Sequence, residues 1–429
     1  MLIRRASLAA VLLAGCGARN ELADSGSVTG VGGATDASSS AALSSSSSTG
    51  GGPSTCGSLL VLDPIMSLPT PGAALVDPQI ALLSDGAVLV SGLEPSGASA
   101  SLRAARATPF GAWPPAAASD AVTLAPQASR FVLGPGVSGP VAYYNDDAGN
   151  LNLLMQTYPS PSAVALGTGG IDPLFVAEAP GRFLTGAATP TPAYEVLDVG
   201  SYEPSSLPQK EMPLVCITSP QRGSAIRSGS GFLAAFLSPN PPEPSCDVMA
   251  PKDGTVLVVG RYDPAASPNL AYTEGHLSVG PEPYFHALLA PRGEGAWLLE
   301  QTDGSTSRVP GPLLVRQLDH AGIEPPLGLP ALAIDTGQLG EVAIAPIGDE
   351  LAVAWIDSLD PSAPTVVVQI VRADLSLGPA ASFSTSAAWF FGSLGLVASA
   401  DGTKLFLAWN ASGGGAPTVG VARVDCIPP

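Results

Sequence analysis

Short apolar runs separated by turn residues recur along most of the chain and predict many short β-strands. Two units near the C-terminus share the order strand, turn, strand: 341–345, Gly348-Asp349 and 351–355 in the first, then 394–398, Asp401-Gly402 and 405–409 in the second. Glycine beside aspartate between two β-rich runs indicates a tight hairpin, because glycine accepts the positive φ that such a turn demands. A further strand, beginning at Thr365 or Thr418, follows each unit.

These units repeat with a nearly regular period. Trp355 and Trp409 are 54 positions apart, and Thr365 and Thr418 are 53 apart. The segments 85–92 and 253–260 are also alike, and further turn signals occur at 135–139, Pro180-Gly181, Ser230-Gly231 and 293–295. A period of about 40–50 residues with three or four strands is typical of β-propeller blades. The sequence therefore predicts an all-β propeller of about seven blades, with six or eight also compatible, and tandem β-sandwiches are the alternative.

The composition agrees with a fold made of short strands. The chain has 49 Gly and 44 Pro among 429 residues, and 45% of its residues are hydrophobic. Apolar content of this size supports a folded core, whereas so many Gly and Pro residues interrupt the apolar runs and disfavour long helices.

The hairpin ending in Ala-Trp, followed by a Thr-Val-x-Val strand, resembles the degenerate blade repeats of secreted bacterial β-propeller proteins. The resemblance covers residues 75–426 and implies one rigid ring that displays variable loops. The sequence lacks the WD40 and kelch signatures and the Asp-box consensus of sialidases, so no catalytic residue is carried over from those families.

The N-terminus has the build of an export signal. Arg4 and Arg5 precede an apolar run at 6–13, and Leu13-Ala14-Gly15-Cys16 resembles the lipobox of bacterial lipoproteins. This resemblance implies cleavage before Cys16 and attachment of a lipid to Cys16. The apolar run is too short to cross a bilayer, which takes roughly 20 residues in a helix. The alternative is an ordinary secretory signal with Cys16 merely nearby.

The sequence thus divides into a signal peptide at 1–15, a lipidated cysteine and disordered linker at 16–55, and a propeller domain at 56–429. The linker is rich in Ser, Gly, Ala and Thr, which offer too little apolar surface to order it, and its root-mean-square reach is about 31–37 Å. Gly17 stands where the lipoprotein family's inner-membrane retention signal carries aspartate. The resemblance therefore implies a location in the cell envelope, at the outer membrane rather than the inner one.

Besides Cys16, the chain has four cysteines: Cys56, Cys216, Cys246 and Cys426. An even number in an exported domain suggests two disulfides, and four cysteines allow three pairings. We favour Cys216–Cys246, which would close a Pro-rich loop, and Cys56–Cys426, which would join the two ends of the folded region. Metal binding is disfavoured because no C-x-x-C spacing occurs and no histidine is near these cysteines.

The net charge is −18, with acidic residues scattered along the chain. Such a protein is repelled by phosphate backbones, so nucleic acid is not an expected partner. The sequence contains no phosphate-cradling Gly-rich loop and no regular metal-ligand spacing, so we expect neither a cofactor nor a metal. We expect a monomer that contacts the membrane through its N-terminal lipid.

Signals for catalysis are weak. The three histidines, His276, His286 and His320, have no recognisable triad context. The nearest carboxylate pairs are Asp146-Asp147, Asp349-Glu350 and Asp357/Asp360. Each pair lies in a turn context, where aspartate is favoured for local hydrogen bonds to the backbone, so turn formation explains them better than catalysis does.

Aromatic residues near turns are the better candidates for binding. Trp113, Tyr143, Tyr144 and Tyr262 could line a propeller rim and contact a protein or glycan ligand, although such aromatics also pack between blades. We therefore expect a membrane-tethered extracytoplasmic binding or scaffold protein of unknown ligand, and not an enzyme. The alternative is an exported polysaccharide-acting hydrolase or lyase that uses carboxylates at the propeller channel.

Overall fold

The computed structural model divides the chain into two compact units, residues 1–50 and 51–429. The residues that it describes all belong to the second unit: 55–65, 67–97, 99–107, 117–156, 160–168, 172–190, 195–202, 215–217, 223–239, 255–263, 271–277, 284–293, 295–303, 310–319, 331–336, 339–357, 364–385, 394–411 and 418–429. The predicted signal peptide, Cys16 and nearly all of the predicted linker lie outside these residues, so those predictions stay predictions.

The described residues form seven four-stranded antiparallel sheets, which we number as blades in chain order, and no helix. Blade 1 comprises β2 (Val76–Leu82), β3 (Val88–Ser96), β4 (Ser99–Ala107) and β5 (Val122–Ala125). Blade 2 comprises β6 (Arg130–Gly134), β7 (Val141–Asn145), β8 (Asn150–Gln156) and β9 (Ser162–Thr168). Blade 3 comprises β10 (Asp172–Ala179), β11 (Arg182–Pro190), β12 (Glu195–Tyr202) and β13 (Val215–Ile217).

The remaining four blades follow the same plan. Blade 4 comprises β14 (Ser224–Ser228), β15 (Gly231–Pro239), β16 (Thr255–Asp263) and β17 (Ala271–Leu277). Blade 5 comprises β18 (Tyr284–Arg292), β19 (Gly295–Asp303), β20 (Pro310–Leu318) and β21 (Leu332–Ile334). Blade 6 comprises β22 (Leu339–Ile347), β23 (Glu350–Asp357), β24 (Thr365–Val371) and β25 (Leu377–Ser384). Blade 7 comprises β26 (Leu394–Ala398), β27 (Lys404–Ala411), β28 (Thr418–Ile427) and, from the other end of the chain, β1 (Ser58–Ile65).

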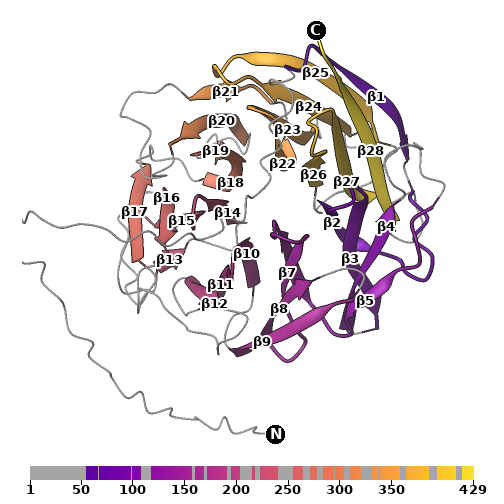
Figure 1. Ribbon diagram of the computed structural model, residues 1–429, viewed down its shortest axis with the longest axis vertical. Coiled ribbons are helices and arrows are strands. Elements are labelled where there is room, and N and C mark those ends of the chain that lie inside the picture. The colour runs from indigo at the N-terminus through magenta and orange to yellow at the C-terminus, as the bar shows by residue number, and fades with distance from the viewer. Residues whose placement is uncertain are drawn as a thin grey trace, which may run out of the picture. The chain divides into compact units, whose positions relative to one another are not determined.

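The first strand of each blade contacts the first strand of the next, and β26 of blade 7 contacts β2 of blade 1. These contacts close a circle of seven inner strands around one axis, with the other strands of each blade stacked outward (Figure 1). The structure is therefore a β-propeller, which confirms the predicted fold class and excludes the tandem sandwiches. The blade number agrees with the predicted value of about seven.

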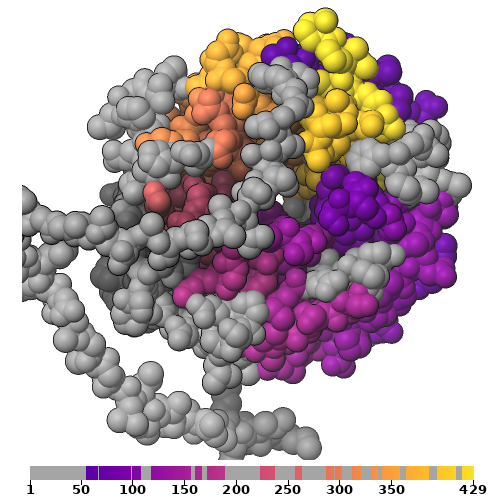
Figure 2. Space-filling model, viewed as in Figure 1, coloured from indigo at the N-terminus to yellow at the C-terminus, as the bar shows by residue number. Residues whose placement is uncertain are grey.

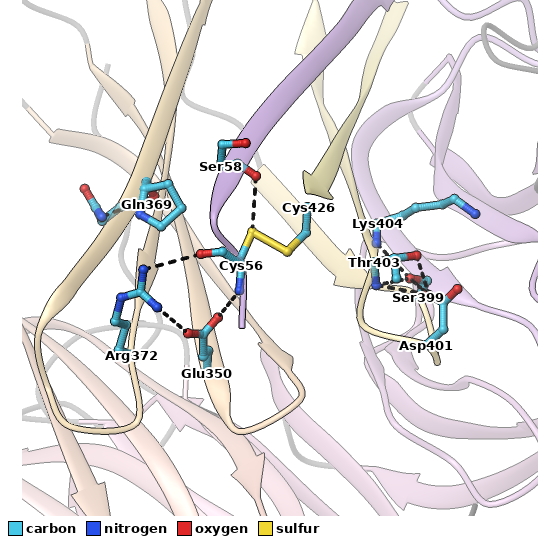
Figure 3. Close-up of a disulfide and its surroundings, with 11 residues drawn as sticks. Cys56, Ser58, Glu350, Gln369, Arg372, Ser399, Asp401, Thr403, Lys404 and Cys426 are labelled. Atoms are coloured by element: carbon cyan, nitrogen blue, oxygen red, sulfur yellow. Dashed lines mark hydrogen bonds and ion pairs between the residues drawn. A yellow bond between two sulfur atoms is a disulfide. The ribbon is translucent and has the colours of Figure 1, made fainter. Parts of the chain in front are cut away.

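Blade 7 joins the two ends of the folded unit. Strand β1 pairs with β28 in antiparallel register, with Leu59 opposite Cys426. Cys56 and Cys426 form a disulfide with their Cα atoms 5.3 Å apart, as the sequence predicted. Beside it, Glu350 of blade 6 accepts a hydrogen bond from the backbone N–H of Cys56 at 3.1 Å and pairs with Arg372 at 3.3 Å (Figure 3). The closure of the ring is thus held by a strand pairing, a covalent bond and the hydrogen bond from Cys56 to Glu350 of blade 6.

The predicted turns are the hairpins that join the first and second strands of the blades. Positive-φ glycines stand in all seven of them: Gly86, Gly139, Gly181, Gly229, Gly293, Gly348 and Gly402. The likeness between segments 85–92 and 253–260 does not reflect equivalent positions, because the first leads into a second strand, β3, and the other into a third strand, β16. Similar residues recur there because β3 and β16 are both middle strands of a blade, and apolar side chains are favoured on both of their covered faces.

The core lies between the blades, and one strand serves two interfaces. In β27, Leu405, Leu407 and Trp409 pack in the cluster shared with blade 6, whereas Phe406 and Ala408 pack in the cluster shared with blade 1. Because both faces of the middle strands are covered, these strands are nearly continuous apolar runs rather than alternating ones. Trp409 is only 1% exposed and belongs to this core.

Candidate functional site

The seven inner strands enclose a central cavity of about 1100 Å³. Apolar residues of different blades line much of it, among them Ile80, Val132, Val176, Ile226, Ile344 and Leu396. In Figure 2 the surface is hollowed near the middle of the ring. This cavity is the natural candidate for a ligand site, because binding pockets are concave, largely apolar and equipped with a few polar groups.

The polar residues of the cavity gather at one end. All inner strands begin at the same end of the ring, and most of the polar lining residues stand at or next to these beginnings. We call this set the polar mouth: Asp77, Ser129, Arg130, Asp172, Ser224 and Glu341. Among the described lining residues it holds three carboxylates and a single cationic side chain, that of Arg130. The mouth therefore carries a formal net negative charge.

Arg130 of blade 2 and Asp172 of blade 3 form an ion pair across the blade junction. The Arg130 side chain is 58% exposed, whereas the Asp172 side chain is only 11% exposed. The pair uses Oδ2 of Asp172, and the buried Oδ1 accepts no hydrogen bond. Burial raises the pKa of Asp172, and this effect outweighs the opposing charge and hydrogen bond of Arg130. The carboxylate is therefore under-solvated at the wall of the cavity.

Two other polar side chains hold neighbouring blades together. The amide of Gln79 donates to the carbonyl of Phe131 at 2.9 Å and accepts from the N–H of Leu133 at 2.7 Å, which ties β2 to β6. Asp77 adopts a φ of 51° and is held by Asn410 of blade 7, through hydrogen bonds of 2.8 and 3.1 Å. The side chains of Gln79 and Asp77 already have hydrogen-bond partners in neighbouring blades, so their main role is to hold the wall of the cavity in place.

The carboxylate pairs expected from turns do not lie in the cavity. Asp146 accepts hydrogen bonds from Ala148 and Asn150 in the turn between β7 and β8, and these bonds outweigh burial and lower its pKa. Glu350 is engaged at the ring closure, Asp357 ends β23, and Asp360 lies outside the described residues. Turn chemistry thus accounts for Asp146, as the sequence suggested. Within the described part of the chain, no group of His, Cys, Asp or Glu is arranged to hold a metal ion.

The expectation that Tyr143, Tyr144 and Tyr262 face a ligand is wrong. They are 2%, 7% and 0% exposed, and each packs in an apolar cluster. Tyr143 and Tyr144 lie on a second strand and Tyr262 on a third, where neighbouring blades cover both faces. These tyrosines therefore stabilise the packing of blades. Trp113 lies outside the described residues.

Several other predicted residues are placed only in part. Cys216 lies on β13 and Cys246 is outside the described residues, so the Cys216–Cys246 pairing stays a prediction. His276 lies on β17 and His286 on β18, while His320 is outside the described residues. In the described segments no helix is long and apolar enough to span a membrane.

No family model matches this chain, and no curated protein matches it. Among solved structures, it is similar to a subtype N10 neuraminidase-like protein of A/little yellow-shouldered bat/Guatemala, at 6% identity and a TM-score of 0.46, over 69% of this chain and 94% of that one. Trypanosoma rangeli sialidase is similar at 9% identity and a TM-score of 0.41, and this chain covers 82% of its own length but only 55% of the sialidase. Drosophila Plexin A, in complex with Semaphorin 1b, is similar at 10% identity and a TM-score of 0.43, over 87% of each chain. At these values the likenesses assign no function.

Proposed function

We propose that this chain is a binding protein of the cell envelope, tethered through a lipid on Cys16, which takes its ligand into the central cavity through the polar mouth. The observation that carries the proposal is the cavity itself, with an apolar wall and a cluster of polar groups at one end. Its volume of about 1100 Å³ lies just above the range of about 300–1,000 Å³ that is typical of small-molecule sites. The bridges made by Gln79 and Asp77 keep its wall rigid, which reduces the entropy lost on binding.

The position of the ring closure supports this proposal. The backbone N–H of Cys56 donates a hydrogen bond to Glu350, and the backbone N–H of Cys426 donates one to the carbonyl of Thr403. Glu350 and Thr403 both lie next to hairpins where inner strands end. The polar mouth lies where inner strands begin, at the opposite end of the ring. Cys56, the residue at which the expected linker joins the ring, therefore lies at the end away from the polar mouth.

A polysaccharide-acting hydrolase is the second candidate, because Asp77, Asp172 and Glu341 all line the cavity. Glycoside hydrolysis needs one carboxyl group with a raised pKa and a second carboxylate that stays ionised. Asp172 has the raised pKa, but it is paired with Arg130, and Asp77 is bound to Asn410. Binding without catalysis therefore fits these contacts better. Release of reducing ends from envelope polysaccharides, lost in Asp172→Asn, would favour the hydrolase instead.

The tether is tested by replacing the cysteine. Wild-type protein should fractionate with membranes and carry a diacyl or triacyl mass on Cys16, whereas Cys16→Ala should be found in the soluble fraction. Fractionation and mass spectrometry of the mature protein make the comparison. An unmodified Cys16 in the membrane-free fraction of the wild type would contradict the proposal.

Ligand binding is tested on the full-length Cys16→Ala chain with labelled isoleucine methyl groups. Ile80, Ile226 and Ile344 line the cavity, whereas Ile356 and Ile370 are buried between blades 6 and 7, do not line it and serve as internal controls. A fractionated extract of envelope small molecules and glycans should shift the cavity methyl signals and leave the controls unchanged. If every fraction leaves the cavity signals in place, the proposed function is wrong.

A further inference from the structure

We infer that the polar mouth binds a ligand that carries an ammonium group on an apolar body, with the ammonium at Asp172 and the body against the cavity wall. This inference rests on the proposed function and adds the chemical class of the ligand. Three observations lead to it: the charge of the mouth, the state of the Asp172 carboxylate, and the composition of the wall.

The charge of the mouth favours a cation. Its described charged residues are Asp77, Asp172 and Glu341 against Arg130, so the carboxylates are in excess. Apolar walls beside them keep the local dielectric low and concentrate the negative potential in the opening. The whole chain carries a net charge of −18, which adds to the attraction for a cation and repels an anion.

Asp172 has bonding capacity that the protein itself does not use. One of its oxygens is paired with Arg130, and the other is buried and accepts no hydrogen bond. A carboxylate can accept about four hydrogen bonds, and an ammonium group brings three N–H donors together with a positive charge. A ligand ammonium that takes the place of Arg130 would therefore keep an opposite charge beside Asp172 and offer three N–H donors to a carboxylate with unused acceptor capacity.

Arg130 is the competitor for the same carboxylate. Because its side chain is 58% exposed, it can rotate toward solvent and stay hydrated while a ligand cation takes its place. A neutral hydroxyl group would instead bind between Arg130 and Asp172 and depend on both. A carboxylate ligand would depend on Arg130 and be repelled by Asp172. The three ligand classes therefore differ in how their affinity should respond to substitution of Arg130 and of Asp172.

The wall suits the apolar body of such a ligand. Ile80, Ile226, Ile344 and Leu396 come from four different blades and line the same cavity. Methyl and methylene groups of this kind favour an aliphatic or aromatic body through the hydrophobic effect and offer it no hydrogen bonds. The amphiphilic character of the site is what distinguishes it from a simple cation site.

The probes are phenylbutylamine, phenylbutanol and phenylbutanoate, which share one apolar body and differ in the charge of the head group. Each is titrated into the full-length Cys16→Ala protein, and the methyl signals of Ile80, Ile226 and Ile344 are followed. The phenyl ring should shift these signals in the amine titration, at concentrations about tenfold below those needed for the alcohol. The reason is that the amine can form a charge-assisted hydrogen bond with Asp172 and the neutral alcohol cannot. The signals of Ile356 and Ile370 report that the fold is intact.

Two substitutions then separate the ligand classes. Asp172→Asn should weaken amine binding about tenfold, and Arg130→Gln should strengthen it, because the competing cation is gone. Asp425→Asn is the matched control: it removes an Asp–Arg pair on β28, outside the cavity, and should leave the affinity unchanged.

The inference is overturned if the alcohol or the acid binds more tightly than the amine, if Asp172→Asn leaves the amine affinity unchanged, or if none of the probes shifts the cavity signals. Tighter binding of the alcohol or acid at the cavity methyl groups would leave the proposed function standing. The extract titration judges the proposed function separately, since it does not depend on the class of ligand. If Asp172→Asn failed to fold, the strengthening expected of Arg130→Gln would still decide the question.

Discussion

At the scale of single residues, Asp172 and Glu300 show how burial and an arginine partner compete. Glu300 pairs with Arg316, as Asp172 pairs with Arg130, and each carboxylate keeps one buried oxygen that accepts no hydrogen bond. In both cases burial raises the pKa more than the arginine lowers it. The two differ in place: Asp172 lines the cavity, whereas Glu300 does not and is fully enclosed in blade 5.

Glu300 should therefore make stability fall with rising pH. Its ordinary pKa is 4.5 and its folded pKa is raised, so the native state binds more protons than the unfolded state between these values. Its contribution to stability is fully present below pH 4.5 and is lost as the pH rises through the folded pKa. Urea unfolding of the wild type and of Glu300→Gln, between about pH 4 and 8, should show the wild type losing stability relative to the variant as the pH rises.

A residue with the opposite shift provides the control. Burial raises the pKa of Asp401, but hydrogen bonds from Ser399 and Thr403 outweigh it and lower the pKa overall. The wild type should therefore lose stability relative to Asp401→Asn as the pH falls, not as it rises. Equal slopes for the two comparisons would contradict the assignment of these pKa directions to burial and hydrogen bonding.

Sequence reasoning was strongest for local backbone geometry and weakest for the site. Gly86, Gly348 and Gly402 were predicted as turn residues because positive φ is a local demand that leaves a local signal. Arg130 and Asp172 were missed, since each is one polar residue in a short strand and they meet only when blades 2 and 3 pack together. The available signal was their shared position at the start of an inner strand, which an alignment of the repeats would have shown.

At the scale of elements, the inner strands approach so closely that some positions admit only glycine. A Cβ at Gly134 of β6 would lie 1.8 Å from the carbonyl oxygen of Val176 in β10. Backbone is rigid at this point, because both strands are paired within their own blades. The spacing between blades 2 and 3, and hence the position of Arg130 relative to Asp172, depends on this contact.

Gly134→Ala should destabilise the protein by more than about 2 kcal/mol, because the added methyl group must push two inner strands apart. Gly378→Ala on the outer strand β25 is the matched control. A Cβ there would lie 3.2 Å from Ile370 side-chain atoms and 3.3 Å from the Ile370 carbonyl oxygen, a much smaller overlap, and the change should cost less than about 1 kcal/mol. Chemical denaturation of the two variants makes the comparison. Similar losses in both would show that the approach of β6 to β10 is not tight.

At the scale of the whole molecule, the repeat period made the ring predictable and left its centre unpredicted. Trp355 and Trp409 stand at equivalent places, each opposite the start of an inner strand, at Val342 and at Leu394. A period and a hairpin signal are enough to count blades, and a closed circle brings the chain ends together. The contents of the cavity follow instead from single residues of seven separate strands, for which the period carries no information.

The disulfide at the ring closure should contribute strongly to global stability. Cys56 and Cys426 are 370 positions apart, and in the chain-entropy model a cross-link over a loop of that length stabilises by roughly 5 to 6 kcal/mol, of which strain and residual structure remove a part. Replacing both cysteines with serine should therefore lower the free energy of unfolding by about 2 to 5 kcal/mol, measured by guanidinium denaturation of the oxidised proteins.

The same variant distinguishes this disulfide from the predicted Cys216–Cys246 pair. Reducing agent should lower the denaturation midpoint of the wild type by at least as much as the double serine substitution does, because both remove the bond between Cys56 and Cys426. Any remaining response of the double variant to reducing agent would report the second disulfide. A double variant as stable as the wild type would mean that the pairing of Ser58–Ile65 with Thr418–Ile427, together with Glu350 and Arg372, closes the ring without covalent help.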